Sequence, residues 1–171
     1  MEERNELERC YEIVWKFRSV VSEWWPTPDK LSATRYACTE GGEVMEAFLR
    51  KMRPGDSRNN ERNIDMLDEM ADLAIMLITA LGPDCERLGD TQWKLTVDQL
   101  VSMMVITDDP NYDHLLETQL MGVACFPGIE LEQRIKERLT RIFGNHVQGK
   151  AENAGELRKE ALWWEQEGEI G

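Results

Sequence analysis

Residues 63–81 read NIDMLDEMADLAIMLITAL and combine two patterns on one predicted helix. The second half, residues 73–81, is apolar nearly all round, which is typical of a buried helix. At about 100° per residue, the acidic side chains of the first half fall on one arc about 100° wide, and this strip continues into the apolar half. Because carboxylates seldom enter apolar surroundings unless they are paired or bind a metal, the strip is a candidate metal site. Its members are Asp65, Asp68, Glu69 and Asp72.

A second acidic pair lies upstream, in TEGGEVMEAFLRK at residues 39–51. Glu40 and Glu43 are three residues apart, as are Glu69 and Asp72, and this spacing makes neighbours on one helix face. If the two helices pack side by side, four carboxylates meet in a small volume, where their repulsion requires a cation between them. Mg²⁺ is the natural candidate, because it prefers carboxylate and water oxygens. The competing interpretation of an acidic helix is a solvated face without a ligand.

The two acidic stretches together resemble a known superfamily. Glu40-Gly-Gly-Glu43-Val-Met-Glu46-Ala, followed by Asp68-Glu-Met-Ala-Asp72-Leu-Ala-Ile, is similar to the E-x-x-E, spacer, E-x-x-D pattern of the all-α NTP pyrophosphohydrolases. That superfamily includes the MazG-like enzymes, the dimeric dUTPases and the phosphoribosyl-ATP pyrophosphohydrolases. The resemblance covers roughly residues 24–82, about a third of the chain.

The resemblance implies a Mg²⁺ site, at which Mn²⁺ can substitute, formed by Glu40, Glu43, Glu69 and Asp72. It further implies that water attacks the α-phosphorus of a nucleoside triphosphate, which gives a nucleoside monophosphate and pyrophosphate. Glu43 or Glu46 would be the base that takes the proton from this water. Since members of the superfamily assemble as dimers or tetramers, a homo-oligomer is also expected.

Substrate contacts are predicted at Trp24, Trp25, Lys30 and Lys94. One interpretation of the adjacent tryptophans places one ring in the core and the other over a turn. The alternative stacks one ring on a nucleobase, as aromatic side chains do with single bases. In the resembling family, basic side chains on a following helix contact the phosphates, and Lys94 is the nearest lysine after the acidic helix. The other basic candidates are Arg87 and, on a more distant helix, Arg134, Lys136 and Arg138.

Gly41 and Gly42 are predicted to lie in mid-helix, where each costs about 1 kcal/mol relative to alanine. Something must offset this cost. Close packing of another helix is one explanation, and the approach of a phosphate or a metal is the other.

Composition argues against several kinds of binding partner. The chain has 171 residues and a formal net charge of −13, which disfavours a nucleic-acid polymer or an anionic membrane surface as partner. No apolar run reaches the ~18 residues of a membrane span, and the N-terminal MEERNELERC lacks the apolar region of a signal peptide. The four cysteines contain no C-x-x-C pair, which argues against zinc and suits a reducing cytoplasm.

Apolar side chains at helical spacing predict an all-α fold, a helical bundle of the MazG-like type, in one domain spanning residues 1–171 with its core at 20–144. Asp29 or Thr27 is the expected N-terminal cap of the second helix, and Gly82-Pro83 the expected stop of the third. The C-terminal segment, about 152–166, is expected to be a helix that docks on a neighbour. The predicted helices are 2–25, about 29–52, 61–81, 95–107, 112–125, 129–143 and 152–166.

Three functions compete. The first is a Mg²⁺-dependent pyrophosphohydrolase of (d)NTPs that cleans the nucleotide pool. The second is a non-catalytic nucleotide or metal sensor with the same fold. The third is a helical interaction protein whose acidic strip binds a basic partner.

Overall fold

The computed structural model describes residues 6–51, 59–83, 113–150 and 162–164. All regular structure in these ranges is helical, which confirms the predicted all-α class. The helices are α1 (Glu6–Val21), α2 (Lys30–Lys51), α3 (Asn59–Leu81), α5 (Asp113–Ala124) and α6 (Leu131–Ile142), followed by the π-helical turn η1 (Phe143–Val147). No helix in the described ranges is long and apolar enough to cross a membrane.

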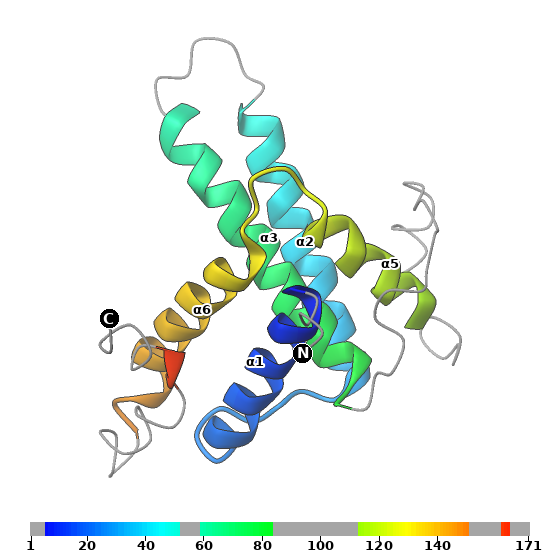
Figure 1. Ribbon diagram of the computed structural model, residues 1–171. Helices are drawn as coiled ribbons and strands as arrows, with labels where there is room; N and C mark the ends of the chain where they lie inside the picture. The colour runs from blue at the N-terminus through cyan, green and yellow to red at the C-terminus, as the bar shows by residue number, and fades with distance from the viewer. Residues whose placement is uncertain (1–5, 52–58, 84–112, 151–161, 165–171) are drawn as a thin grey trace, which may run out of the picture.

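The central element is α3, which contacts α1, α2, α5 and α6. Figure 1 shows α2 and α3 as a long antiparallel pair, with α1, α5 and α6 packed around it. This position follows from the sequence of α3, because a helix that is apolar on all faces needs neighbours on all of them. Leu73, Ala74, Ile75, Leu77 and Ile78 are all buried.

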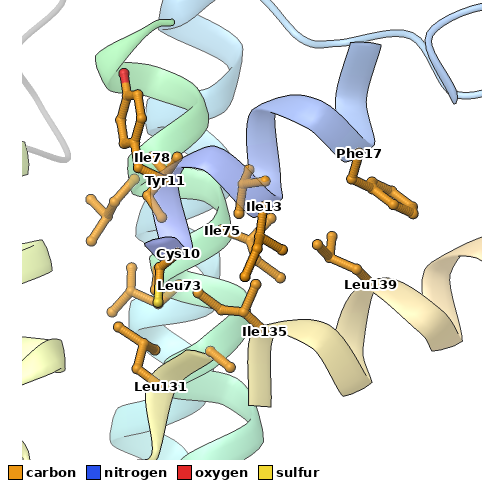
Figure 2. Close-up of a cluster of buried hydrophobic side chains, with 14 of the residues drawn as sticks. Cys10, Tyr11, Ile13, Phe17, Leu73, Ile75, Ile78, Leu131, Ile135 and Leu139 are labelled. Atoms are coloured by element: carbon orange, nitrogen blue, oxygen red, sulfur yellow. The ribbon is translucent and has the colours of Figure 1, made fainter. Parts of the chain in front are cut away.

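The core lies where α1, α3 and α6 meet (Figure 2). Each helix supplies apolar side chains at helical spacing: Cys10, Ile13 and Phe17 from α1, Leu73, Ile75 and Ile78 from α3, and Leu131, Ile135 and Leu139 from α6. The packing holds the polar faces of α3 and α6 next to each other at the rim of this core. The acidic strip therefore faces the arginines of α6.

The ends of the helices agree with the sequence at two points and differ at two others. Asp29 caps α2, since the Ser32 N–H donates to Asp29 Oδ1 over 2.8 Å, and this hydrogen bond holds the pKa of Asp29 below its ordinary value. Gly82 ends α3 with φ of 90°, a conformation that favours glycine. Helix α1 ends at Val21, before the predicted Trp25. The helix predicted at 129–143 is α6 up to Ile142, and the helical chain then continues as η1 to Val147, beyond the predicted end.

Several predictions lie outside the described residues: the helix at 95–107, Lys94, Arg87, and most of the C-terminal segment. The described part of that segment packs on α1 of the same chain. Leu162 is buried, the ring centroid of Trp164 lies 6.5 Å from that of Phe17, and Lys16 Nζ lies 4.0 Å from the centre of the Trp163 ring.

Candidate metal centre and adjoining cavity

Three of the four predicted metal ligands converge. Glu40 and Glu43 on α2 and Glu69 on α3 each offer one carboxylate oxygen, and these oxygens lie within 4.8 Å of one another. The arrangement follows from the i, i+3 spacing on α2 and from the side-by-side packing of α2 and α3. Three carboxylate oxygens at this separation are a donor set that suits a hard divalent cation.

The pKa values of this group indicate that its negative charges are not balanced by nearby positive charges. Burial, with repulsion from Asp72, Glu43 and Glu69, raises the pKa of Glu40 to about 7. The pKa of Glu69 is raised to about 7 by burial, with repulsion from Asp72 and Glu43 and a hydrogen bond to Glu43. The residues therefore fit a metal, because a bound cation would replace the proton that these groups otherwise retain near neutral pH.

The fourth predicted ligand, Asp72, is held by an arginine. Arg138 Nε donates to Asp72 Oδ1 over 2.9 Å, and Arg138 Nη2 donates to Asp72 Oδ2. The Asp72 side chain is 16% exposed, and burial raises its pKa despite the opposing effect of Arg138. Asp68 is paired in the same way, since Arg134 Nη1 lies 3.1 Å from Asp68 Oδ1. The three members of the acidic strip whose side chains the structure describes are thus divided: Glu69 joins the three-carboxylate group, and Asp68 and Asp72 pair with α6.

Two further predicted site residues lie apart from this group. Glu46 is exposed on α2 and pairs with Arg50, one turn along the same helix. Lys30 pairs with Asp113 on α5 and is not among the described residues that line the adjoining cavity.

A cavity of about 470 Å³ adjoins the carboxylates, a size within the usual range for small-molecule sites. Glu40 belongs both to the three-carboxylate group and to the cavity wall, so it connects the two. The wall mixes acidic, basic and aromatic side chains from α1, the connection between α1 and α2, α2, α3, α6 and η1. It consists of Arg18, Trp25, Pro26, Pro28, Tyr36, Glu40, Asp72, Ile75, Met76, Arg138, Arg141, Ile142, Asn145 and His146.

The two tryptophans take different places. Both are half-buried against the core, but only Trp25 lines the cavity. Its ring packs edge-on against Phe17, with centroids 6.2 Å apart, and lies 4.4 Å from the guanidinium carbon of Arg18. Of the two predicted stacking residues, Trp25 is therefore the one positioned to meet a ligand.

Packing does not explain the glycines of α2. Among the described residues, a Cβ built at Gly41 or at Gly42 would meet no atom within 4 Å, so none of the described helices requires a glycine there. Of the two explanations offered by the sequence, close packing of another helix is wrong for the helices that the structure describes. The approach of a phosphate or a metal stays a prediction.

Sequence reasoning gave no role at the site to Arg18 and left the arginines of α6 as distant candidates. A signal for each is visible in retrospect. Arg134 and Arg138 are four residues apart on α6, as are Asp68 and Asp72 on α3, and this matched spacing lets two ion pairs form at once. Arg18 lies in the apolar stripe of α1, four residues after Val14 and three before Val21.

No family model, curated protein or solved structure matches this chain.

Proposed function

We propose that this protein is a Mg²⁺-dependent nucleoside triphosphate pyrophosphohydrolase of the MazG-like type, converting (d)NTPs to (d)NMPs and pyrophosphate. One observation supports this most strongly. The three-carboxylate group adjoins, through Glu40, a cavity that has an aromatic wall at Trp25 and arginines at positions 138 and 141. A nucleotide needs a surface for its base, positive charge for its phosphates and a metal at the phosphate to be attacked, and the arrangement offers residues for each.

Glu40, Glu43 and Glu69 would hold the ion. Bound Mg²⁺ supplies neutralisation of phosphate oxygens and lowers the pKa of a nearby water. Glu43 is the exposed member of the three, whereas Glu40 and Glu69 are partly buried. In this proposal, Glu43 orients the attacking water and accepts its proton. Glu46, which lies one turn further along α2 and pairs with Arg50, is the alternative base.

The other residues would position the substrate. Arg138 keeps its charge because Asp72 raises the pKa of its guanidinium, and it lines the cavity while paired with Asp72. Arg141 is exposed one turn further along α6 and is available to a phosphate. Asp72 is outside the three carboxylates that converge, so it would join the metal only if its oxygens moved closer to that group.

The test is pyrophosphate release from a panel of dNTPs, with and without Mg²⁺, by wild type and Glu43→Gln. We expect release that requires Mg²⁺ and that falls at least about a hundredfold in the variant, as expected for loss of a general base. Glu8→Gln, which removes one exposed carboxylate of α1, is the matched control and should retain full activity.

The alternatives give different results in the same assay. Binding of Mg²⁺ and nucleotide without turnover would identify a sensor. If the protein neither binds Mg²⁺ and nucleotide nor turns nucleotide over, the remaining function is that of an acidic helical interaction protein. Equal activity of Glu43→Gln and wild type would remove Glu43 from the mechanism.

We also propose a homo-oligomer, dimer or tetramer, of this protein. Met45, Phe48 and Leu49 follow one another at helical spacing on α2 and are 53%, 44% and 55% exposed. An apolar stripe of this kind on a helix favours burial against another surface.

A further inference from the structure

Arg18 is a buried cation held from three sides. Its side chain comes from α1 and is 1% exposed. Nε donates to Thr79 Oγ1 over 2.8 Å, Nη2 lies 3.7 Å from Met76 Sδ, and the ring of Trp25 covers the guanidinium at 4.4 Å. The three contacts fix the position of the guanidinium, but hydroxyl, thioether and indole contribute no full negative charge.

Arg18 also lacks a counter-ion within the described part of the chain. None of the described carboxylates forms an ion pair with it, and its Nη1 has no hydrogen-bond partner there. Burial lowers the pKa of Arg18 to about 10, so the group stays protonated at neutral pH. This contrasts with Arg134 and Arg138, each of which faces an aspartate. A buried charge without a partner is costly, and natural proteins seldom retain one without a use for it.

The unpartnered Nη1 is itself buried, and it belongs to a residue of the cavity wall. Arg18 lines the cavity together with Trp25, Arg141 and His146. We infer that Arg18 anchors an oxyanion subsite in this cavity, where its Nη1 donates to an oxygen of a phosphate or carboxylate group that supplies the missing negative charge. A charge-assisted hydrogen bond of this kind is about twice as strong as a neutral one.

This subsite does not depend on the proposed function, because it needs neither a metal nor turnover. The same oxyanion chemistry could come from a phosphate or from a carboxylate ligand. The experiment therefore compares both sources in the presence of a chelator, so that failure of the metal site and failure of the oxyanion site are distinguishable.

The experiment is thermal unfolding with chloride replaced stepwise by phosphate, pyrophosphate or acetate at constant ionic strength. Wild type should show a saturable rise in Tm, as expected for a ligand that binds only the folded state. Arg18→Met should abolish this rise and unfold in chloride at the same or a higher Tm, since an apolar side chain of similar length removes an unpaired buried charge. Arg35→Met, which removes an exposed arginine of α2, should behave as wild type.

A second variant covers the case in which Arg18→Met does not unfold cooperatively. Thr79→Val removes the hydroxyl that accepts from Arg18 Nε, and it should raise the half-saturating anion concentration about fivefold, the equivalent of one hydrogen bond. A rise with phosphate and pyrophosphate alone assigns the subsite to phosphates, and a rise with acetate as well assigns it to oxyanions in general. The inference is overturned by no rise, or by an unsaturable rise equal in wild type, Arg18→Met and Arg35→Met, which is the general effect of excluded salts.

Discussion

The carboxylates of α2 and α3 differ in pairing and in pKa because the charges around them differ. Asp68 and Asp72 face arginines of α6 and are paired. Glu40 and Glu69 face other carboxylates, and burial with this repulsion raises the pKa of each to about 7. These four carboxylates therefore form two pairs, the aspartates that are compensated by arginines and the glutamates that are short of positive charge. Only the two glutamates gain from a bound cation.

The raised pKa values predict how stability depends on pH when a chelator removes divalent metal. Below pH 4.5, the ordinary pKa of a glutamate side chain, Glu40 and Glu69 are protonated in both the folded and the unfolded chain. As the pH rises from about 4.5 to about 7, the unfolded chain releases these protons while the folded chain retains them, so the free energy of unfolding decreases. Urea unfolding across this window should show the decrease.

Variants assign this pH dependence to the site. Glu40→Gln should make the decrease shallower, because the amide does not ionise, whereas Glu8→Gln should leave it unchanged. Added Mg²⁺ should also flatten the profile, since the ion stabilises the ionised carboxylates. An identical slope for wild type and Glu40→Gln would contradict the assigned electrostatics.

At the scale of the helix, α2 contains two glycines that its own packing does not require. Gly42 is exposed, and its added Cβ would meet no atom within 4 Å. Gly42→Ala should therefore stabilise the protein by about 1 kcal/mol through helix propensity alone. Chemical denaturation measures this gain, and a loss of stability would show that the glycine has a structural role.

The same substitution tests the functional explanation. If a phosphate of the substrate approaches the backbone of α2 at this point, Gly42→Ala should lower pyrophosphate release while it raises stability. Unchanged release would leave the glycines unexplained by function. Gly144→Ala, at another exposed glycine with no atom within 4 Å of its added Cβ, is the matched control for stability.

The sequence predicts the helices well because their periodicity is a local property. The apolar run of α3 and the cap at Asp29 are visible from residues close together in the chain. Which helix faces the acidic strip is a long-range property, and the sequence left the arginines of α6 distant from it. Arg138 reaches Asp72 across 66 residues of chain, and Arg18 reaches Thr79 across 61, so neither contact follows from local pattern.

For the whole molecule, the formal net charge of −13 contrasts with the local concentration of arginines in the cavity. A strongly acidic surface repels polyanions, whereas a cavity with its own cations can still accept a small anion. Charge at the scale of the molecule therefore argues against nucleic-acid polymers, and charge at the scale of the cavity favours a small anion.

The apolar stripe of Met45, Phe48 and Leu49 on α2 is the proposed interface of a homo-oligomer. If wild type is a dimer or tetramer through this stripe, Phe48→Glu should lower the molar mass measured by light scattering after size exclusion, because it buries an unpaired charge in the interface. Gln148→Glu adds the same charge at an exposed position after η1 and should not change the mass. A monomeric wild type, or an unchanged mass for Phe48→Glu, would contradict the proposed interface.

In the proposed function, carboxylates of α2 and α3 form one divalent-cation site. The most direct measurement is titration of the protein with Mn²⁺ by electron paramagnetic resonance, with Mg²⁺ as competitor. We predict one class of tight sites that Mg²⁺ displaces, and binding at least about tenfold weaker in Glu69→Gln, since affinity for a hard cation follows the number of charged ligands. Glu8→Gln should bind as wild type. Equal Mn²⁺ affinity in wild type, Glu69→Gln and Glu8→Gln would show that Glu69 does not hold the ion and would contradict a cation site between α2 and α3.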